Sequence, residues 1–132
     1  MEKKDRWSEE NYYFRIYSIG KNKVEIFRRI FPGLNFQVDQ LRKRSNIRQK
    51  IQRFTIVIEL NKNQKYFKYV PQIINFIKEN KIPKTSYGLW ISLSENRDHG
   101  GLNVPSYVKE FYSKIYSEIG GQLDFSYIFL EI

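Results

Sequence analysis

The stretch from residue 87 to residue 107 collects the residue types that acid–base chemistry requires. Its sequence, YGLWISLSENRDHGGLNVPSY, contains the single histidine of the chain, His99, beside Asp98 and close to Glu95. A carboxylate next to an imidazole can orient and charge it, as general acid–base sites require. However, no Ser-His-Asp order, phosphate-binding glycine pattern or metal-ligand spacing accompanies these residues. A polar turn followed by a glycine pair with positive φ explains them better, and we expect no catalytic residue.

A basic segment is the second candidate site. Residues 41–53, LRKRSNIRQKIQR, contain no acidic residue and six cations: Arg42, Lys43, Arg44, Arg48, Lys50 and Arg53. Residues 1–68 hold 17 Lys and Arg against 7 Asp and Glu, whereas residues 69–132 hold 6 against 7. The net charge of +9 therefore comes from the N-terminal half, which predicts a surface that attracts an anionic partner.

Aromatic residues are the third candidate, since they make up 17% of the chain. Alternation along a strand predicts that Trp90 lies on the face opposite Leu89 and Ile91. Exposed Trp, Tyr and Arg side chains dominate the binding energy of protein interfaces. We therefore expect Trp90 to contribute to partner binding.

Composition excludes several classes of site. The chain has 132 residues, which suits one domain with its own core. It has no cysteine, so disulfides and thiolate metal sites are excluded, and one histidine argues against a His-based metal site. We expect no cofactor. The charged start, MEKKDRWSEEN, and the lack of a long apolar run predict a cytoplasmic protein without a membrane span.

Hydrophobic periodicity predicts the elements that position these residues. Alternating or continuous apolar runs predict strands over residues 12–19, 54–60, 87–93 and 125–132. Apolar residues three and four positions apart predict helices over residues 23–31, 66–79 and 105–119. The first helix has Asn22 as its expected cap and Val24, Phe27, Ile30 and Phe31 on its apolar face. Residues 1–10 are expected to fray, and residues 34–52 are an uncertain basic connection, expected to be a loop with a possible short strand or helix.

This order of elements predicts a single α+β domain over residues 1–132. We expect a sheet of about four mainly antiparallel strands with three helices on one face, related to the ferredoxin-like split βαβ plan.

Three stretches also carry a family resemblance: YFRIYSI, WISLSENRDHGGLNVPSYV and GGQLDFSYIFLE. They resemble the first strand, the strand–loop–helix run and the last strand of small bacterial α+β proteins of unknown function. That group includes proteins assigned as immunity proteins of polymorphic and contact-dependent toxins. The resemblance implies a non-enzymatic protein that binds and neutralises a toxin domain, and no contact residue carries over by position.

The charge sets an expectation for such a partner. Immunity proteins against nuclease toxins are commonly acidic and mask a basic site, whereas this chain is strongly basic. We therefore expect a partner that is acidic at the contact. The expected contact residues are the basic segment together with Trp90 and His99.

Two alternatives remain. The first is a nucleic-acid-binding module in which residues 42–53 follow the phosphate backbone while exposed tyrosines, expected at Tyr12, Tyr66 and Tyr69, stack on bases. A ferredoxin-like sheet is also the scaffold of the RNA-recognition domain, but FTIVIEL lacks the basic-aromatic pattern of that domain. The second alternative is an acid–base enzyme centred on His99.

Overall fold

Five strands and three α-helices make up the part of the chain that the computed structural model describes, which is residues 8–40, 53–95 and 103–129. In chain order they are β1 (Ser8–Ile19), α1 (Lys21–Ile30), β2 (Gln37–Gln40), β3 (Phe54–Glu59), α2 (Val70–Glu79), β4 (Tyr87–Glu95), α3 (Ser106–Ile119) and β5 (Gln122–Phe129). Short 3₁₀ helices at Phe67–Tyr69 and Lys84–Ser86 precede α2 and β4. The predicted α+β class is confirmed.

The strands form one mixed sheet in the order β2-β3-β1-β4-β5. β1 lies in the middle and pairs antiparallel with β3 and with β4. β3 and β4 are therefore parallel to each other on either side of β1, so that β3, α2 and β4 form a split βαβ unit. The sheet has one strand more than the four expected, because β2 pairs antiparallel with β3. It lies in residues 34–52, for which the sequence predicts a loop with a possible short strand or helix.

The last strand departs furthest from the prediction. β5 pairs parallel with β4, because α3 carries the chain back across the sheet before β5 begins. The strand covers residues 122–129 rather than 125–132, since Gln122 already pairs with Gly88 directly after the Gly120–Gly121 turn. Both glycines of that turn have positive φ, 71° and 142°, which ends α3 as expected. Residues 130–132 lie outside the described part of the chain.

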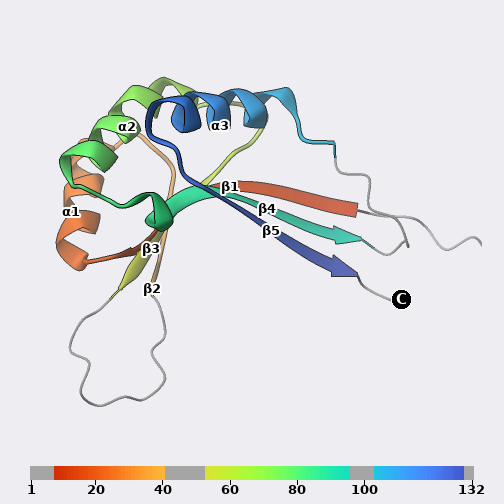
Figure 1. The fold of residues 1–132 in the computed structure, drawn as a ribbon, viewed down its shortest axis with the longest axis horizontal. Helices are drawn as coiled ribbons and strands as arrows, with labels where there is room; N and C mark the ends of the chain where they lie inside the picture. The colour runs from red at the N-terminus through yellow and green to blue at the C-terminus, as the bar shows by residue number, and fades with distance from the viewer. Residues whose placement is uncertain (1–7, 41–52, 96–102, 130–132) are drawn as a thin grey trace, which may run out of the picture.

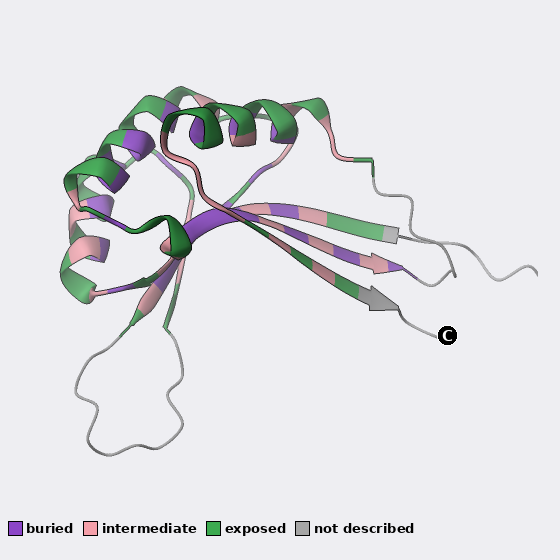
Figure 2. Ribbon diagram, in the orientation of Figure 1, coloured by how far each residue is buried: buried purple, intermediate pink, exposed green. Residues whose placement is uncertain are grey.

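All three helices pack on one face of the sheet (Figure 1), and the hydrophobic core lies between them and the strands. Aromatic rings from both layers meet there: Phe14 of β1 lies 5.4 Å from Phe111 of α3, and Phe27 of α1 lies 5.1 Å from Phe76 of α2. Figure 2 shows that burial is greatest where the helices overlie the strands. The exposed strand residues include Glu9 and Glu10 of β1 and Leu123, Phe125 and Tyr127 of β5.

Three predictions at the ends of elements are wrong. Asn22 does not cap α1, because the helix starts directly after β1 with Gly20 at the N-cap. Ile30 is 40% exposed, and Phe31, the residue after the last helical turn, is buried in its place. Pro105 was expected as the first residue of the third helix, but it is the N-cap of α3, which starts at Ser106.

The expected fraying of residues 1–10 is also wrong in part. Ser8, Glu9 and Glu10 belong to β1, where they pair with Glu95, Ser94 and Leu93 of β4. Residues 1–7 lie outside the described part of the chain.

Candidate functional site

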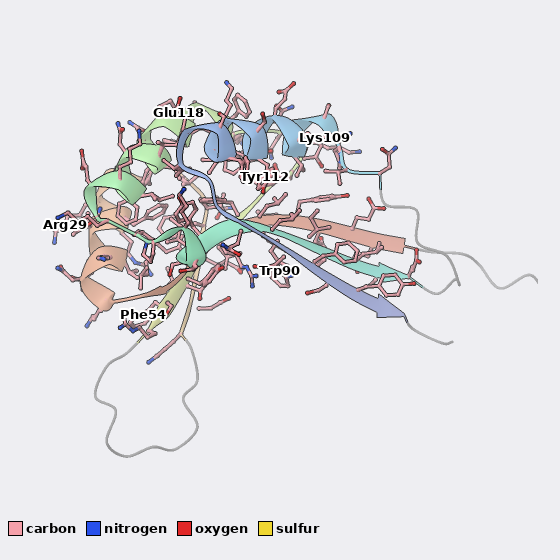
Figure 3. The ribbon with its side chains drawn as sticks, in the orientation of Figure 1. Arg29, Phe54, Trp90, Lys109, Tyr112 and Glu118 are labelled. Carbon is pink, nitrogen blue, oxygen red and sulfur yellow. The ribbon has the colours of Figure 1, made fainter. Side chains whose placement is uncertain are left out.

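The face of the sheet away from the helices, here called the open face, is the candidate site. Side chains alternate along each strand, so that Tyr12, Phe14 and Ile16 of β1 enter the core while Tyr13, Arg15 and Tyr17 point to the open face. Trp90 of β4 lies on the same face, away from the helices (Figure 3). This confirms the expected placement of Trp90 opposite Leu89 and Ile91.

Strand register aligns four open-face residues in one row across the sheet. Glu59 of β3 pairs with Tyr13 of β1, Tyr13 pairs with Trp90 of β4, and Trp90 pairs with Asp124 of β5. We call this set the cross-strand row. Adjacent strands are about 4.8 Å apart, so the row spans about 14 Å. Two aromatic rings therefore form its centre and a carboxylate forms each end.

Arg15 joins the cross-strand row from the neighbouring position of β1. Its Nη2 donates a hydrogen bond to Oδ2 of Asp124 at 3.0 Å, which also makes an ion pair. Its guanidinium carbon lies 4.4 Å from the centre of the Trp90 ring and 5.5 Å from that of Tyr17. The residue opposite Arg15 on β4 is Gly88. Because Gly88 has no side chain, Arg15 can reach across β4 to β5.

A second structural constraint also requires glycine at position 88. A Cβ atom at this position would meet the backbone of Gln122. The close approach of β4 to the start of β5 therefore depends on glycine, and with it the position of Asp124 two residues further along β5.

Trp90 is held on several sides, which fixes its orientation. Its ring stacks on Tyr13 with centroids 5.0 Å apart, and its Nε1 donates a hydrogen bond to Oγ of Ser126 on β5 at 3.0 Å. Together with the guanidinium of Arg15, these contacts build one cluster of Tyr13, Arg15, Trp90, Asp124 and Ser126, here called the Trp90 cluster. A rigid aromatic cluster on an uncovered surface is typical of a preorganised binding site.

The tyrosines of the open face stay protonated well above neutral pH. Burial raises the pKa of Tyr13, and the charges of Glu59 and Glu9 raise it further. Burial also raises the pKa of Tyr17, with a further rise from Asp124 and an opposing effect from Arg15. Both hydroxyl groups are therefore neutral hydrogen-bond donors at physiological pH.

The open face is acidic although the whole chain is basic. Among the described residues, Arg15 is the single Lys or Arg that lies in a strand. Four carboxylates occupy open-face positions of the strands: Glu9, Asp39, Glu59 and Asp124. The other described cations lie on helices and connections, as Arg29 of α1 and Lys109 of α3 illustrate in Figure 3. The strand side chains of the open face are therefore net acidic, whereas the chain as a whole is net basic.

Two hollows flank Glu59. One, of about 150 Å³, is lined by side chains of the open face and of the chain before β2: Tyr13, Asn35, Phe36, Gln37, Val57 and Glu59. The other, of about 300 Å³, shares Asn35 and Glu59 and continues to Asn61, Asn63 and Lys65. The Glu59 side chain is exposed and makes no hydrogen bond or ion pair with the described residues.

Only two of the predicted contact residues lie in the described part of the chain. Trp90 belongs to the Trp90 cluster, and Arg53 lies at the start of β3, where its Nη1 donates to the backbone oxygen of Ser18 at 3.4 Å. The structure does not bring these two together. The remaining predicted contact residues lie outside the described residues: Arg42, Lys43, Arg44, Arg48, Lys50 and His99.

The expected acid–base site is described only at Glu95, since Asp98 and His99 lie outside the described residues. Glu95 is 1% exposed on the helix side of β4, and the hydroxyl of Tyr127 donates to its Oε1 at 2.8 Å. The tyrosines expected on the surface are mostly buried, because Tyr12 and Tyr66 are 4% and 3% exposed. That prediction is wrong for both, as each ring packs into the core.

Strand alternation is a weak signal for the open-face residues that the prediction missed. The alternation of YYFRIYSI around Arg15 places Tyr13, Arg15 and Tyr17 on one face. Their partners Glu59 and Asp124 are distant in sequence, and only the strand register joins them.

Comparisons with known proteins add no assignment. The chain matches no protein-family model, no curated protein and no solved structure. Within the described ranges, no group of three or more His, Cys, Asp and Glu side chains is arranged to hold a metal ion. No helix in those ranges is both long and apolar enough to cross a membrane. Among the described residues, the open face is therefore the surface that best fits a binding site.

Proposed function

We propose that this chain is a non-enzymatic protein-binding protein that recognises its partner through the open face. The observation that carries this proposal is the Trp90 cluster on a sheet face that no described helix covers. Sheets in globular proteins usually bury an apolar face, and a face left open is ordinarily polar. Here its centre holds two aromatic rings and an arginine, the residue types that contribute most to protein interfaces.

The geometry of the cluster supports high affinity for a protein surface. Trp90, Tyr13 and Arg15 already contact one another, so binding would order few additional side chains. Small polar side chains surround them, including Asn11, Ser92 and Ser126 at neighbouring register positions. An aromatic centre with a polar rim is the usual anatomy of a protein interface.

We further propose that the partner is a bacterial toxin domain, which this chain neutralises by direct binding. This part rests on the resemblance to immunity proteins carried by residues 13–19, 90–108 and 120–131. The second of these stretches starts at Trp90 and the third contains Asp124 and Ser126, so the resembling segments supply part of the Trp90 cluster.

Nucleic-acid binding is a weaker proposal for the open face. A phosphate backbone needs several cations along its path, whereas the strands present four carboxylates and one arginine on this face. Binding through residues 42–53 would be independent of the open face, and of their cations only Arg53 is described.

The proposal is tested with the gene that precedes this one. If that gene encodes a large protein, its C-terminal domain is produced and its binding to this chain is measured by calorimetry. We expect a one-to-one complex that restores growth to cells producing the domain, and loss of both binding and protection with Trp90→Ala. Tyr116→Ala is the matched control, because Tyr116 is an aromatic residue, 55% exposed, on helix α3.

Three results would overturn the proposal. The first is a neighbouring gene without a toxin-like product together with no co-purifying partner. The second is binding that Trp90→Ala leaves intact. The third is retention of single-stranded DNA or RNA whose affinity falls linearly in log salt, which would favour a nucleic-acid module instead.

A further inference from the structure

We infer that the partner of the open face is cationic at the contact, and that one of its lysine or arginine side chains enters the smaller of the two hollows beside Glu59. This inference rests on the proposed function, since it assigns the chemistry of the partner that the open face would bind. It differs from the acidic contact expected from the basic segment, because the open face has the opposite charge.

Charge complementarity is the first argument. The cross-strand row has a carboxylate at each end, but the two ends differ. Asp124 is already neutralised by Arg15 at 3.0 Å, whereas Glu59 has no ion pair with any described residue. Glu59 is thus the end of the row at which a positive group of a partner gains the most.

The shape and lining of the hollow are the second argument. Its volume of about 150 Å³ lies below the several hundred Å³ of a typical small-molecule site, which suits a single long side chain. Val57 and the ring of Tyr13 provide apolar walls for the methylene groups. The Tyr13 ring also provides a surface for a cation–π contact.

The available hydrogen-bond acceptors are the third argument. Lys and Arg side chains donate hydrogen bonds and accept none. Asn35 and Gln37, whose amide oxygens can accept hydrogen bonds, line the smaller hollow beside Glu59. Asn61 lines the larger one, and its buried Oδ1 has no hydrogen-bond partner among the described residues. Lys65 lines the larger hollow but not the smaller one, so the smaller hollow offers acceptors and no competing cation from its described lining.

Selection from a random peptide library displayed on phage tests this inference, with the wild-type chain as bait and the Trp90→Ala variant as counter-selection. We expect the enriched peptides to carry Lys or Arg. Their affinities are then measured by fluorescence anisotropy. Glu59→Gln should weaken binding about tenfold, as expected for loss of a charge-assisted contact, and added salt should weaken the wild-type complex.

Glu79→Gln is the matched control, because Glu79 is an exposed carboxylate on α2, and it should leave the affinity unchanged. Enriched peptides that depend on Trp90 but lack basic residues, or that tolerate Glu59→Gln, would overturn the inference and leave the proposed function standing. If no enriched peptide depends on Trp90, the proposed function fails as well. A chain dimer that Trp90→Ala dissociates would assign the open face to a second copy and overturn the inference.

Discussion

The two faces of β1 show how one strand serves two purposes. On the helix side, Tyr12, Phe14 and Ile16 are at most 4% exposed and meet rings and aliphatic side chains from all three helices. On the open face, the alternate residues Tyr13, Arg15 and Tyr17 stay partly exposed and contact side chains from neighbouring strands. The comparison teaches that adjacent residues of one strand can lie in opposite environments, one in a packed core and the other on an open surface.

The largest expected effect is a difference in unfolding free energy between substitutions on the two faces of β1. Phe14 is 1% exposed and packs against Phe111 and Tyr87, so Phe14→Ala should lower the free energy of unfolding by about 3–5 kcal/mol. Tyr13→Ala, one residue away on the open face, should cost about 1 kcal/mol. Urea denaturation measures both. Equal losses of unfolding free energy for the two variants would show that the open face stabilises the fold as much as the core does.

The next effect separates the faces by binding. Trp90→Ala should weaken partner binding by about 2 kcal/mol or more, the range of an interface hot spot. Its cost to the free energy of unfolding should be smaller, about 1 kcal/mol, because the ring is only partly buried. Calorimetric titration and thermal denaturation of the same variant check the two values. A larger loss in stability than in binding would make Trp90 a structural residue.

A smaller effect tests whether the Trp90 cluster is held by its ion pair. A double-mutant cycle with Arg15→Met and Asp124→Asn should give a coupling of about 0.5 kcal/mol, since the two side chains are 25% and 46% exposed. The Lys78–Glu118 pair on the helices is longer, 3.9 Å, and more exposed, 54% and 61%. Its coupling should be close to zero. Equal coupling energies for the two ion pairs would mean that the Arg15–Asp124 pair contributes no more than an ordinary surface ion pair.

The smallest effect at neutral pH concerns a tyrosine of the buried side. Burial raises the pKa of Tyr66 to about 12, with a further rise from Tyr107. The protonated hydroxyl is thus favoured in the fold, so its contribution to stability is complete below pH 10 and is lost as the pH rises towards 12. Tyr66→Phe should flatten the fall in unfolding free energy between pH 10 and 12. An unchanged slope would show that Tyr66 does not ionise in that range.

The sequence predicted the individual helices and strands more fully than it predicted which strands pair and in which direction. The strand around Arg15, the helix with Pro71 in its first turn and the end of α3 at Gly120 follow from periodicity and from backbone preferences. The parallel direction of β5 and its start at Gln122 depend on where α3 delivers the chain, which no local pattern encodes. β2 has only four residues, too few for a clear period.

The candidate site was predicted only in part for the same reason. Trp90 is identified by its residue type and by the alternation of β4. In the sequence, nothing distinguishes Glu59 and Asp124 from other charged residues in or at the end of a strand. Only the strand register shows that they lie on either side of Tyr13 and Trp90. The formal charge of the whole chain, +9, is misleading here because the strand side chains of the open face are net acidic.

The central place of β1 also affects how the chain folds during synthesis. β1 is synthesised before its two partners in the sheet, β3 and β4. Until β4 emerges, one backbone edge of YYFRIYSI has no partner from the native sheet, and pairing over such sequence distances is slow. A nascent chain stalled before Tyr87 should therefore need a chaperone to avoid aggregation through that edge.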